Sequence, residues 1–381
     1  MKTILYIWRS MASLAGVERV LSMKINWLAS HGYKVILVTY EQCHHPIVFS
    51  FHPNVKIVDL KTPFFQLSKY SLYLRYFKYL RMKEVFSCRL KEIVNDVHPD
   101  VVLTIAGSMN VLKEIYNACY GTKLIIESHE SFSSVMKEPA YSHHPILRMV
   151  AKLYDKQNLK YVNRFNNVIT LTKGDADEWK KHILTKIDII PNLLDIPFYI
   201  NRREETYHRI IAAGRLEEIK GFDRLIKAFS MIEKKCPQWR VDIYGNGSCK
   251  ESLQAMINNY HLENRVFLQS PTSQLFNEYQ QSDFCVLSSH HEGFGMVMLE
   301  AMSCETPCVA FRCKYGPEEI IEHPKTGMLV KNGDVQELAN AMLWMIEHPA
   351  ERSAMGKAAR EATKRYDKDE IMKKWEKLFS S

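Results

Sequence analysis

The chain has 381 residues, enough for two or three domains at roughly 100–200 residues per domain. Hydrophobic residues make up 46% and charged residues 25%, an ordinary globular composition that excludes disordered, collagen-like and disulfide-stapled proteins. No apolar run approaches the ~18 residues of a membrane-spanning helix. The nine cysteines are an odd number without a C-x-x-C pair, so we expect reduced thiols and a cytoplasmic protein.

The net charge of +8 is unevenly distributed. Residues 1–200 contain 26 Lys and Arg against 17 Asp and Glu, whereas residues 201–381 contain 25 against 26. A basic first half and a balanced second half indicate that the two halves meet different partners.

Short apolar runs alternate with longer amphipathic segments along the whole chain. This alternation is typical of βαβ units and parallel sheets. We expect strands at 3–8, 34–39, 55–59, 101–104, 123–127, 167–170, 210–213, 240–244, 266–268, 284–287, 307–310 and 327–330. We expect helices, among others, at 16–31, 221–235, 250–260 and 335–347.

Both halves show this pattern, which predicts an α/β protein with two doubly wound domains, at 1–190 and 200–364. The boundary is expected where a strand ends before Pro191 and a polar stretch with residues 203–205 follows. Ligands of such sheets bind outside the carboxyl ends of the strands. A cleft between the two domains is therefore the expected place for chemistry.

The most informative motif runs from His290 to Ala301, directly after the predicted strand 284–287. Gly293 and Gly295 at a strand-to-helix turn would let backbone N–H groups approach a ligand, and a helix N-terminus favours an anion. Glu292 is expected in the loop before the helix and Glu300 about two turns inside it. A carboxylate there suits sugar hydroxyls better than phosphate. By itself the pattern is equally compatible with a glycine turn and a solvated glutamate.

A second motif ends the strand 210–213. Gly214 is followed by Arg215, Lys220 and Gly221, and the two cations could neutralise a diphosphate, Arg by bidentate contact and Lys as a point charge. A solvated basic loop explains the motif equally well. A further glycine turn, Tyr244-Gly245-Asn246-Gly247, ends another strand of the same half and is weak evidence alone.

In the first half, His129 closes the strand 123–127. A histidine there could donate to a ligand oxygen or transfer a proton, although a structural role is the commoner one. The loop 13–19 has a single glycine, Gly16, where a dinucleotide fingerprint needs G-x-G-x-x-G, which disfavours a nicotinamide cofactor.

We expect no metal and no cofactor. His291-Glu292 begins like H-E-x-x-H, but position 295 is glycine. The doublets His44-His45, His143-His144 and His290-His291 lack helical i, i+4 spacing.

Together these motifs resemble glycosyltransferase family 4, retaining enzymes of the GT-B architecture that use nucleotide-diphosphate sugars. GT-B implies two Rossmann-like domains facing a central cleft. The landmarks cover nearly the whole chain: Gly16-Val17-Glu18, His129, Leu171-Thr172-Lys173, Ile190-Pro191-Asn192, Gly214-Arg215 with Lys220-Gly221, Tyr244-Gly245-Asn246-Gly247, the E-x7-E pair Glu292 and Glu300, and Gly327-Met328-Leu329-Val330.

The resemblance implies a role for each matching residue. Arg215 and Lys220 would hold the donor diphosphate, Glu292 would contact the transferred sugar, and Glu300 the ribose hydroxyls. His129 would contact the donor sugar near the reacting carbon. The expected catalytic residues are Glu292, His129, Arg215 and Lys220; the expected donor-binding residues are Gly16, Gly214, Arg215, Lys220, Gly245, Glu292, Gly293, Phe294, Gly295, Met296, Val297 and Glu300.

The resemblance also implies metal independence, front-face attack, and a C-terminal helix at 365–381 that packs back onto the first domain. The chain departs from the family at Ala15, Glu130 and Gln269, which bear on donor identity and loop shape. A UDP-sugar is the default donor.

The segment 64–91 interleaves aromatic and basic residues, with Glu84 as its only acid. We expect a basic aromatic helix that docks on the anionic inner face of the plasma membrane to reach a glycan or lipid-diphosphate-linked acceptor. An ordinary helix with a solvated basic face is the alternative. No nucleic-acid module accompanies these charges, so no nucleic-acid partner is expected. The basic residues singled out for this contact are Lys69, Arg75, Lys78, Arg81 and Lys83.

Three alternative functions remain open at the level of sequence. A nucleotide-sugar 2-epimerase shares the architecture and would turn over without an acceptor. A metal-dependent transferase is suggested only by Asp175-Ala176-Asp177, where the acids more plausibly enrich the first turn of a helix. A non-catalytic sugar-nucleotide-binding or scaffold subunit would tolerate Glu292→Ala and Lys220→Ala.

Overall fold

The computed structural model describes residues 1–13, 15–136, 145–197, 200 and 208–380. The doublet His143-His144 and the polar stretch 203–205 lie outside the described residues. The chain divides into two compact units: unit 1 comprises Met1–Leu193 and Met372–Ser381, and unit 2 comprises Leu194–Ile371.

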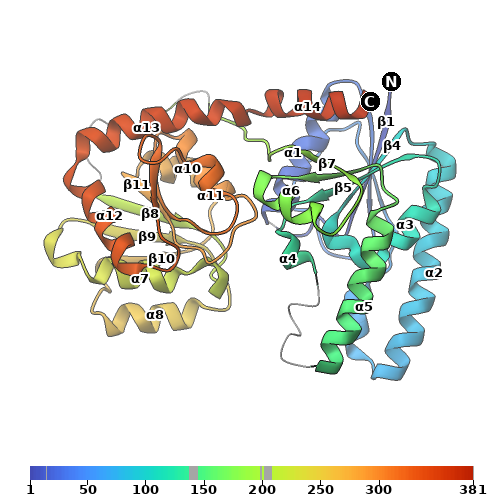
Figure 1. Ribbon diagram of the computed structural model, residues 1–381, viewed down its shortest axis with the longest axis horizontal. Helices are drawn as coiled ribbons and strands as arrows, with labels where there is room; N and C mark the ends of the chain where they lie inside the picture. The colour runs from blue at the N-terminus through green and yellow to red at the C-terminus, as the bar shows by residue number, and fades with distance from the viewer. Residues whose placement is uncertain (14, 137–144, 198–199, 201–207, 381) are drawn as a thin grey trace. The chain divides into compact units, whose positions relative to one another are not determined.

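Unit 1 is built on a seven-stranded parallel sheet with the strand order β3-β2-β1-β4-β5-β6-β7 (Figure 1). The central strands are almost wholly buried, as expected for a parallel sheet covered by helices on both faces. The strands are β1 (Thr3–Trp8), β2 (Lys34–Thr39), β3 (Lys56–Asp59), β4 (Val101–Ile105), β5 (Lys123–Ser128), β6 (Asn167–Thr170) and β7 (Lys186–Ile189).

The helices of unit 1 follow the strands in a βαβ sequence. Helix α2 is the longest of them, and its apolar face contributes Phe86 and Leu90 to the core. The helical elements are α1 (Gly16–Ser30), η1 (Phe64–Lys69), α2 (Leu72–Val97), η2 (Ala106–Val111), α3 (Leu112–Ala118), α4 (Phe132–Val135), α5 (Pro145–Val162) and α6 (Lys173–Lys180).

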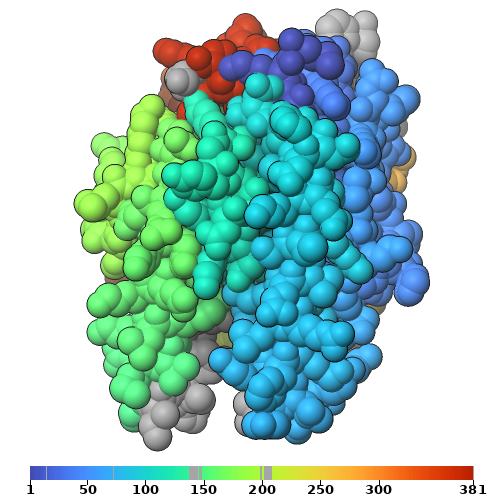
Figure 2. Space-filling view, turned by 90° about the vertical axis from the view of Figure 1, so that its right-hand side faces the viewer, coloured from blue at the N-terminus to red at the C-terminus, as the bar shows by residue number. Residues whose placement is uncertain are grey.

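The C-terminal helix α14 (Lys368–Ser380) contributes its last two thirds to unit 1. The Lys2 ammonium donates to the Phe379 carbonyl at 2.5 Å, and the Tyr33 hydroxyl donates to Glu376 at 3.1 Å. The two ends of the chain therefore lie side by side, as both views show (Figures 1 and 2).

Unit 2 repeats the architecture with a six-stranded parallel sheet in the order β10-β9-β8-β11-β12-β13. Its strands are β8 (Arg209–Ala213), β9 (Arg240–Tyr244), β10 (Val266–Gln269), β11 (Phe284–Leu287), β12 (Cys308–Phe311) and β13 (Gly327–Val330). Its helical elements are η4 (Glu218–Lys220), α7 (Phe222–Ser230), η5 (Glu233–Lys235), α8 (Lys250–Asn259), α9 (Leu275–Gln280), α10 (Met296–Ser303), α11 (Pro317–Ile320), α12 (Val335–Glu347), α13 (Pro349–Thr363) and η6 (Lys364–Tyr366).

The predicted fold class is confirmed: each unit is a parallel sheet with helices between its strands, which is the Rossmann-like arrangement. All twelve predicted strands are present. Strand β7 was not among the predicted ranges, although a strand end was expected before Pro191.

Two helix predictions were wrong in extent. The expected helix 221–235 ends at Ser230 and is followed by the short η5 turn. The segment 64–91 is not one helix, because η1 and an extended Tyr70 precede α2. Within the described residues, no helix has both the length and the hydrophobicity to cross a membrane.

Candidate active site

Unit 2 gathers glycine turns at the carboxyl ends of neighbouring strands. A Cβ on Gly245 would lie 1.9 Å from the carbonyl oxygen of Gly214, and one on Gly247 would lie 2.4 Å from that of Leu216. The turns after β8 and β9 thus pack backbone against backbone, and the Leu216 amide donates to the Asn246 carbonyl at 2.9 Å. Only glycine permits this approach at positions 245 and 247, so these two residues build the edge on which the site rests, with the Gly214 carbonyl against Gly245.

Lys220 is brought to the end of β11 by a second glycine contact. Gly221 has a φ of +60°, and a Cβ there would lie 2.2 Å from the carbonyl oxygen of Ser288. The Ser288 hydroxyl donates to the Lys220 carbonyl at 3.1 Å. The loop after β8 and the loop after β11 are therefore locked together through their backbones.

The two sequence motifs meet in an ion pair. Lys220 Nζ lies 2.7 Å from Glu292 Oε1, and the Ser289 hydroxyl donates to the same oxygen at 2.6 Å. The Glu292 side chain is 7% exposed and that of Lys220 is 20% exposed. A partly exposed cation thus sits beside a buried carboxylate held from two sides. Burial and the nearby Glu292 carboxylate raise the pKa of Cys313 to about 12, so this thiol stays protonated.

Helix α10 begins directly after this pair. Gly295 is its N-cap, with a φ of +96°, and Met296 is its first residue. Phe294 anchors the preceding turn: its ring is buried and packs edge-on against Tyr366, with ring centroids 5.7 Å apart. The first N–H groups of a helix have no partner within it, and the helix dipole adds partial positive charge. Gly293, Gly295, Met296 and Val297 thus belong to a turn suited to an anion.

Glu300 was misplaced by about one turn. It was expected about two turns inside the helix, but α10 starts at Met296, so Glu300 is its fifth residue. The reason is that the turn 293–295 uses a left-handed residue before the helix begins. The Glu300 side chain is buried rather than solvated.

Arg215 follows Gly214 at the end of β8, and its side chain is exposed. Its electrostatic neighbour is Glu217, whose pKa is lowered by hydrogen bonds from Ser248 and, to a smaller extent, by Arg215. Arg215 and Lys220 therefore stand on the same loop, one exposed and one bound to Glu292.

In unit 1, His129 lies at the end of β5 in a buried ionic cluster. His129 Nε2 lies 3.0 Å from Glu127 Oε2, and Lys24 Nζ of α1 lies 2.6 Å from the same oxygen. Gly16 is the first residue of α1, and a Cβ there would meet nothing within 4 Å.

The D-x-D acids do not converge. Asp175 is buried in α6 and accepts a hydrogen bond from the Phe132 amide at 2.8 Å, whereas the Asp177 side chain is 51% exposed. Burial raises the pKa of Asp175 to about 6. In the described part of the chain, no three His, Cys, Asp or Glu residues are close enough to hold a metal ion.

The basic residues singled out for a membrane differ in their surroundings. Lys69, Lys78 and Arg81 are exposed. Arg75 donates to the carbonyls of residues 67 and 68 at 3.1 and 2.9 Å. Lys83 is paired with Glu114 at 3.2 Å, and its side chain is only 19% exposed.

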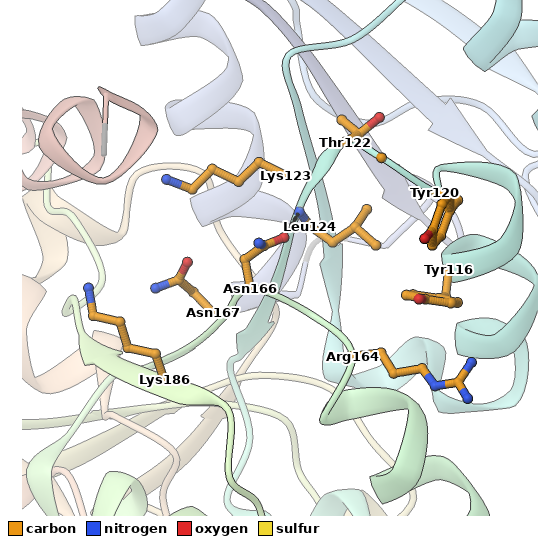
Figure 3. A pocket seen from close by; sticks show the side chains of 10 residues that line it. Tyr116, Tyr120, Thr122, Lys123, Leu124, Arg164, Asn166, Asn167 and Lys186 are labelled. Atoms are coloured by element: carbon orange, nitrogen blue, oxygen red, sulfur yellow. Dashed lines mark hydrogen bonds between the residues drawn. The ribbon is translucent and has the colours of Figure 1, made fainter.

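A further hollow of about 680 Å³ lies at the amino ends of β5 and β7 (Figure 3). Lys123 and Lys186 line one side, and Arg164, Tyr116 and Tyr120 line the other. None of the predicted catalytic or donor-binding residues lines it.

Sequence reasoning missed three partners of the site. Lys24, which binds Glu127, carries no local motif. Ser289 lies directly before the motif that begins at His290 and was not among the predicted site residues. Arg224 donates to His290 Nδ1 at 2.8 Å. The pKa of His290 is lowered mainly by burial and, to a smaller extent, by the Arg224 cation. The i+4 spacing of Lys220 and Arg224 on the loop and first turn of α7 is the one local signal that could have indicated the last contact.

The two Rossmann-like units make this an α/β protein of paired doubly wound domains. One of them carries interlocked glycine turns and a helix N-terminus beside a lysine–glutamate pair. Comparisons with known proteins agree. A family model described as "Glycosyltransferase Family 4" matches residues 14–197, and one described as "Glycosyl transferases group 1" matches residues 198–362. The chain therefore belongs to glycosyltransferase family 4, with the GT-B fold.

Curated relatives include two that align end to end. An uncharacterized glycosyltransferase of Haemophilus influenzae is 25% identical over 100% of both chains, as is the amylovoran biosynthesis glycosyltransferase AmsD of Erwinia amylovora. A poly(ribitol-phosphate) alpha-N-acetylglucosaminyltransferase of Staphylococcus aureus is 30% identical over 60% of this chain and 47% of its own length.

Solved structures share the fold. Sucrose-phosphate synthase of Thermosynechococcus elongatus superimposes with a TM-score of 0.80 at 18% identity, covering 100% of this chain and 98% of the other. A point mutant of S. aureus TarM, crystallised with fondaparinux, alpha-GlcNAc-glycerol and UDP, gives a TM-score of 0.75 at 19% identity and full coverage of both chains.

Proposed function

We propose that the protein is a retaining glycosyltransferase that moves a hexose-type sugar from a UDP-sugar to a glycan or lipid-diphosphate-linked acceptor in bacterial cell-surface polysaccharide synthesis. The observation that carries this proposal is the ion pair of Lys220 and Glu292 beside the N-terminus of α10. A cation from the loop after β8 meets a carboxylate and helix-start amide groups from the loop after β11. These groups match the three parts of such a donor: diphosphate, sugar hydroxyls and the phosphate-sugar junction.

In this account Arg215 and Lys220 hold the donor diphosphate and stabilise the charge that develops on the departing nucleotide. Their different exposure supports different roles for the two cations. The exposed Arg215 can form a bidentate contact with phosphate, whereas Lys220 is already fixed by Glu292. We propose that these two cations supply the counter-charge without a metal ion.

Glu292 contacts the transferred sugar in this proposal, because a buried carboxylate with a serine neighbour accepts hydrogen bonds from hydroxyl groups. Glu300 contacts the ribose hydroxyls. The amides from Gly293 to Val297 meet the donor sugar and phosphates, as the start of α10 favours.

The relatives support the substrate class. AmsD is named for amylovoran biosynthesis, and the S. aureus enzyme for transfer of N-acetylglucosamine to poly(ribitol-phosphate). TarM was crystallised with UDP. These names describe polymers of the bacterial cell surface, which is the class of acceptor proposed for this chain.

We further propose that unit 1 docks on the inner face of the plasma membrane. Among the residues whose burial the structure describes, eight large apolar side chains are exposed on the N-terminal halves of α2 and α5, which project from the same end of unit 1 (Figures 1 and 2). Lys78 and Arg81 of α2 and Lys152 and Lys156 of α5 are exposed beside them. We call these eight the tip surface: Tyr73, Leu74, Tyr76, Phe77, Leu80, Met149, Val150 and Leu153.

The tip surface combines what an anionic membrane requires. Aromatic side chains such as Tyr73, 73% exposed, suit the headgroup region, and the flanking cations are each worth about 1 kcal/mol near an anionic surface. This position would keep the enzyme near a lipid-linked acceptor and supports a cytoplasmic, peripheral location.

The test is a panel of UDP-, GDP- and ADP-sugars assayed for nucleotide release in EDTA, with Glu292→Ala beside the wild type. Release from one donor that depends on Glu292 supports a metal-independent transferase and identifies the donor. Activity that EDTA abolishes contradicts metal independence.

Conversion of a donor without any acceptor, to an epimer rather than to free nucleotide, would favour the 2-epimerase alternative. Donor binding by calorimetry without turnover, even with glycan and lipid-linked acceptors, would favour a non-catalytic binding subunit.

A further inference from the structure

The hollow of about 680 Å³ in unit 1 lies where neighbouring strands of the sheet begin. Lys123 and Lys186 are the first residues of β5 and β7, and β6 lies between these two strands. The volume is within the range of ligand sites, about 300–1,000 Å³. Strand β5 has 6 residues and is therefore about 20 Å long. This length separates the hollow from the carboxyl end of β5, so the hollow is distinct from the candidate active site.

The hollow is positively charged. Among the described residues that line it are the cations Lys123, Arg164 and Lys186, and no acid. The pKa of Lys123 is lowered first by burial and then by the neighbouring Lys2 and Lys186 cations, an effect that Asp188 only partly offsets. Asp188 also pairs with Lys186 at 3.5 Å. One carboxylate thus faces three ammonium groups, and a bound anion would reduce the repulsion among them.

The other side of the hollow is aromatic (Figure 3). Tyr120 is 78% exposed and packs edge-on against Tyr116, with ring centroids 5.9 Å apart. The Arg164 guanidinium lies 5.2 Å from the centroid of the Tyr116 ring, and this stacking helps to hold it in place. An exposed tyrosine ring offers an apolar face to the C–H groups of a sugar ring, and the guanidinium can bind a carboxylate or phosphate through two hydrogen bonds.

The two sides together select the chemistry of a ligand. An inorganic ion is too small to contact both sides of a hollow of this volume, whereas a ligand with an acidic group and a sugar ring reaches both. The carboxamide of Asn166 lies between the sides and suits hydroxyl groups (Figure 3). A nucleic-acid strand carries a phosphate on every nucleotide and favours a continuous groove of cations, but here amides and aromatic rings divide the cations.

The hollow does not belong to the tip surface. Arg164 follows the C-terminus of α5, whereas Met149, Val150 and Leu153 of the tip surface lie in the N-terminal half of that helix. At 1.5 Å per residue, Met149 is about 20 Å from the end of α5 at Val162. A lipid headgroup in a membrane that contacts the tip surface would therefore not reach the hollow.

We propose that this hollow binds an acidic glycan, a saccharide chain with carboxylate or phosphate groups. An acidic group would lie on the side of Lys123 and Lys186, and a neighbouring sugar ring against Tyr120. The inference rests on the proposed function only in that the glycan would be the polymer on which the enzyme acts. It goes beyond that function by assigning a second site, away from the transfer chemistry, that retains the chain between transfer events.

Calorimetric titration of the full chain tests the site without any donor. A galacturonate hexamer supplies carboxylates, a phosphorylated mannose pentamer supplies phosphate, and maltohexaose is the neutral reference. At least one acidic chain should bind about tenfold or more tightly than maltohexaose. Arg164→Gln with Lys186→Gln should weaken that binding at least about tenfold, because two charge-assisted contacts are lost. Tyr120→Ser should weaken it severalfold. Lys123 is left intact because it also donates to the Leu378 carbonyl of α14.

The matched control is Lys34→Gln with Lys56→Gln. These exposed lysines begin β2 and β3, toward the opposite edge of the same sheet, so the control removes the same number of charges from the same end of the strands. It should bind the acidic chain as the wild type does. Equal weakening by both double variants would show a general effect of charge and would overturn the site.

The remaining outcomes also decide. Binding of neither acidic chain, or equal binding of maltohexaose, overturns the inference. Tighter binding of a thymidylate hexamer would instead favour nucleic acid, and loss of anionic-vesicle binding in Arg164→Gln with Lys186→Gln would favour a lipid headgroup; either result overturns it. Acidic-chain binding without sugar transfer from any donor would support the site while the proposed function fails, and transfer without such binding would do the reverse.

Discussion

Lys220 and Glu292 are 72 positions apart in the chain, yet Lys220 Nζ lies 2.7 Å from Glu292 Oε1. The contact exists because Gly221 packs against the Ser288 carbonyl and because Ser288 in turn binds the Lys220 carbonyl. A diphosphate that binds to Lys220 must therefore share this lysine with Glu292. The pair couples the part of the site that would hold phosphate to the part that would hold sugar.

The first prediction follows from this sharing. Glu292→Gln removes the negative charge that competes with a diphosphate for Lys220, so UDP affinity should stay equal or rise up to about tenfold, whereas kcat should fall by at least about 100-fold. Calorimetric titration with UDP and a nucleotide-release assay measure the two quantities. Glu218→Gln, an exposed acid on the same loop, is the control and should change neither. Weaker UDP binding by Glu292→Gln would contradict the assignment of Lys220 to the diphosphate and of Glu292 to the sugar.

Gly221 should be intolerant of a side chain. At a φ of +60° and with the Ser288 carbonyl 2.2 Å from an added Cβ, Gly221→Ala must displace backbone, and we expect a loss of about 2 kcal/mol or more in the free energy of unfolding. Gly16→Ala, where a Cβ meets nothing within 4 Å, should change stability by less than about 1 kcal/mol. Urea unfolding followed by circular dichroism compares the two. Equal losses would show that the loop can shift freely.

Much of the fold was predictable because buried parallel strands are continuous apolar runs. Strands such as β2 and β11 carry that signal in full. Strand β7, Lys186–Ile189, lies at the sheet edge and alternates polar with apolar residues, so its pattern is weaker.

The site was predictable only in part, because the sequence shows local motifs but not the contacts between distant residues. The motifs after β8 and β11 are local and could be read, but Lys24 meets Glu127 across 103 positions through tertiary packing alone. The start of α10 depends on the left-handed Gly295, a backbone choice that residue spacing does not reveal. The pairing of Lys83 could not be predicted either, because its partner, Glu114, lies on another helix.

Asp175 should make stability depend on pH. Its pKa is raised to about 6 in the folded protein, mainly by burial, against an ordinary value of 3.8. Below pH 4 both states hold the proton. As the pH rises from about 4 through 6, the unfolded state releases it first, so the folded state loses stability, by roughly 2–3 kcal/mol.

Asp175→Asn should remove this loss. Urea unfolding of wild type and variant at several pH values between 4 and 7 should show the variant gaining relative stability as the pH rises. Asp177→Asn, an exposed acid on the same helix, should follow the wild type. A pH-independent difference between Asp175→Asn and wild type would contradict the assignment.

The tip surface predicts membrane binding that has an apolar as well as an electrostatic part. Wild-type protein should co-sediment with vesicles containing anionic lipid, and Tyr73→Ser with Phe77→Ser should reduce the bound fraction even at moderate salt. Lys78→Gln with Arg81→Gln should weaken binding mainly at low salt.

Tyr120→Ser is the matched control, because Tyr120 is an exposed aromatic of unit 1, 78% accessible, outside the tip surface. Equal binding of all four proteins to neutral and anionic vesicles would exclude this surface as a membrane contact.

The most direct test of the central claim is the turnover of Lys220→Ala with its identified donor. Loss of a cation that stabilises the departing diphosphate should lower kcat about 10²–10³-fold. Lys227→Ala removes an exposed lysine of α7 and should keep kcat at the wild-type level. A folded Lys220→Ala with wild-type kcat would contradict the claim that the Lys220–Glu292 pair is the centre of the transfer site.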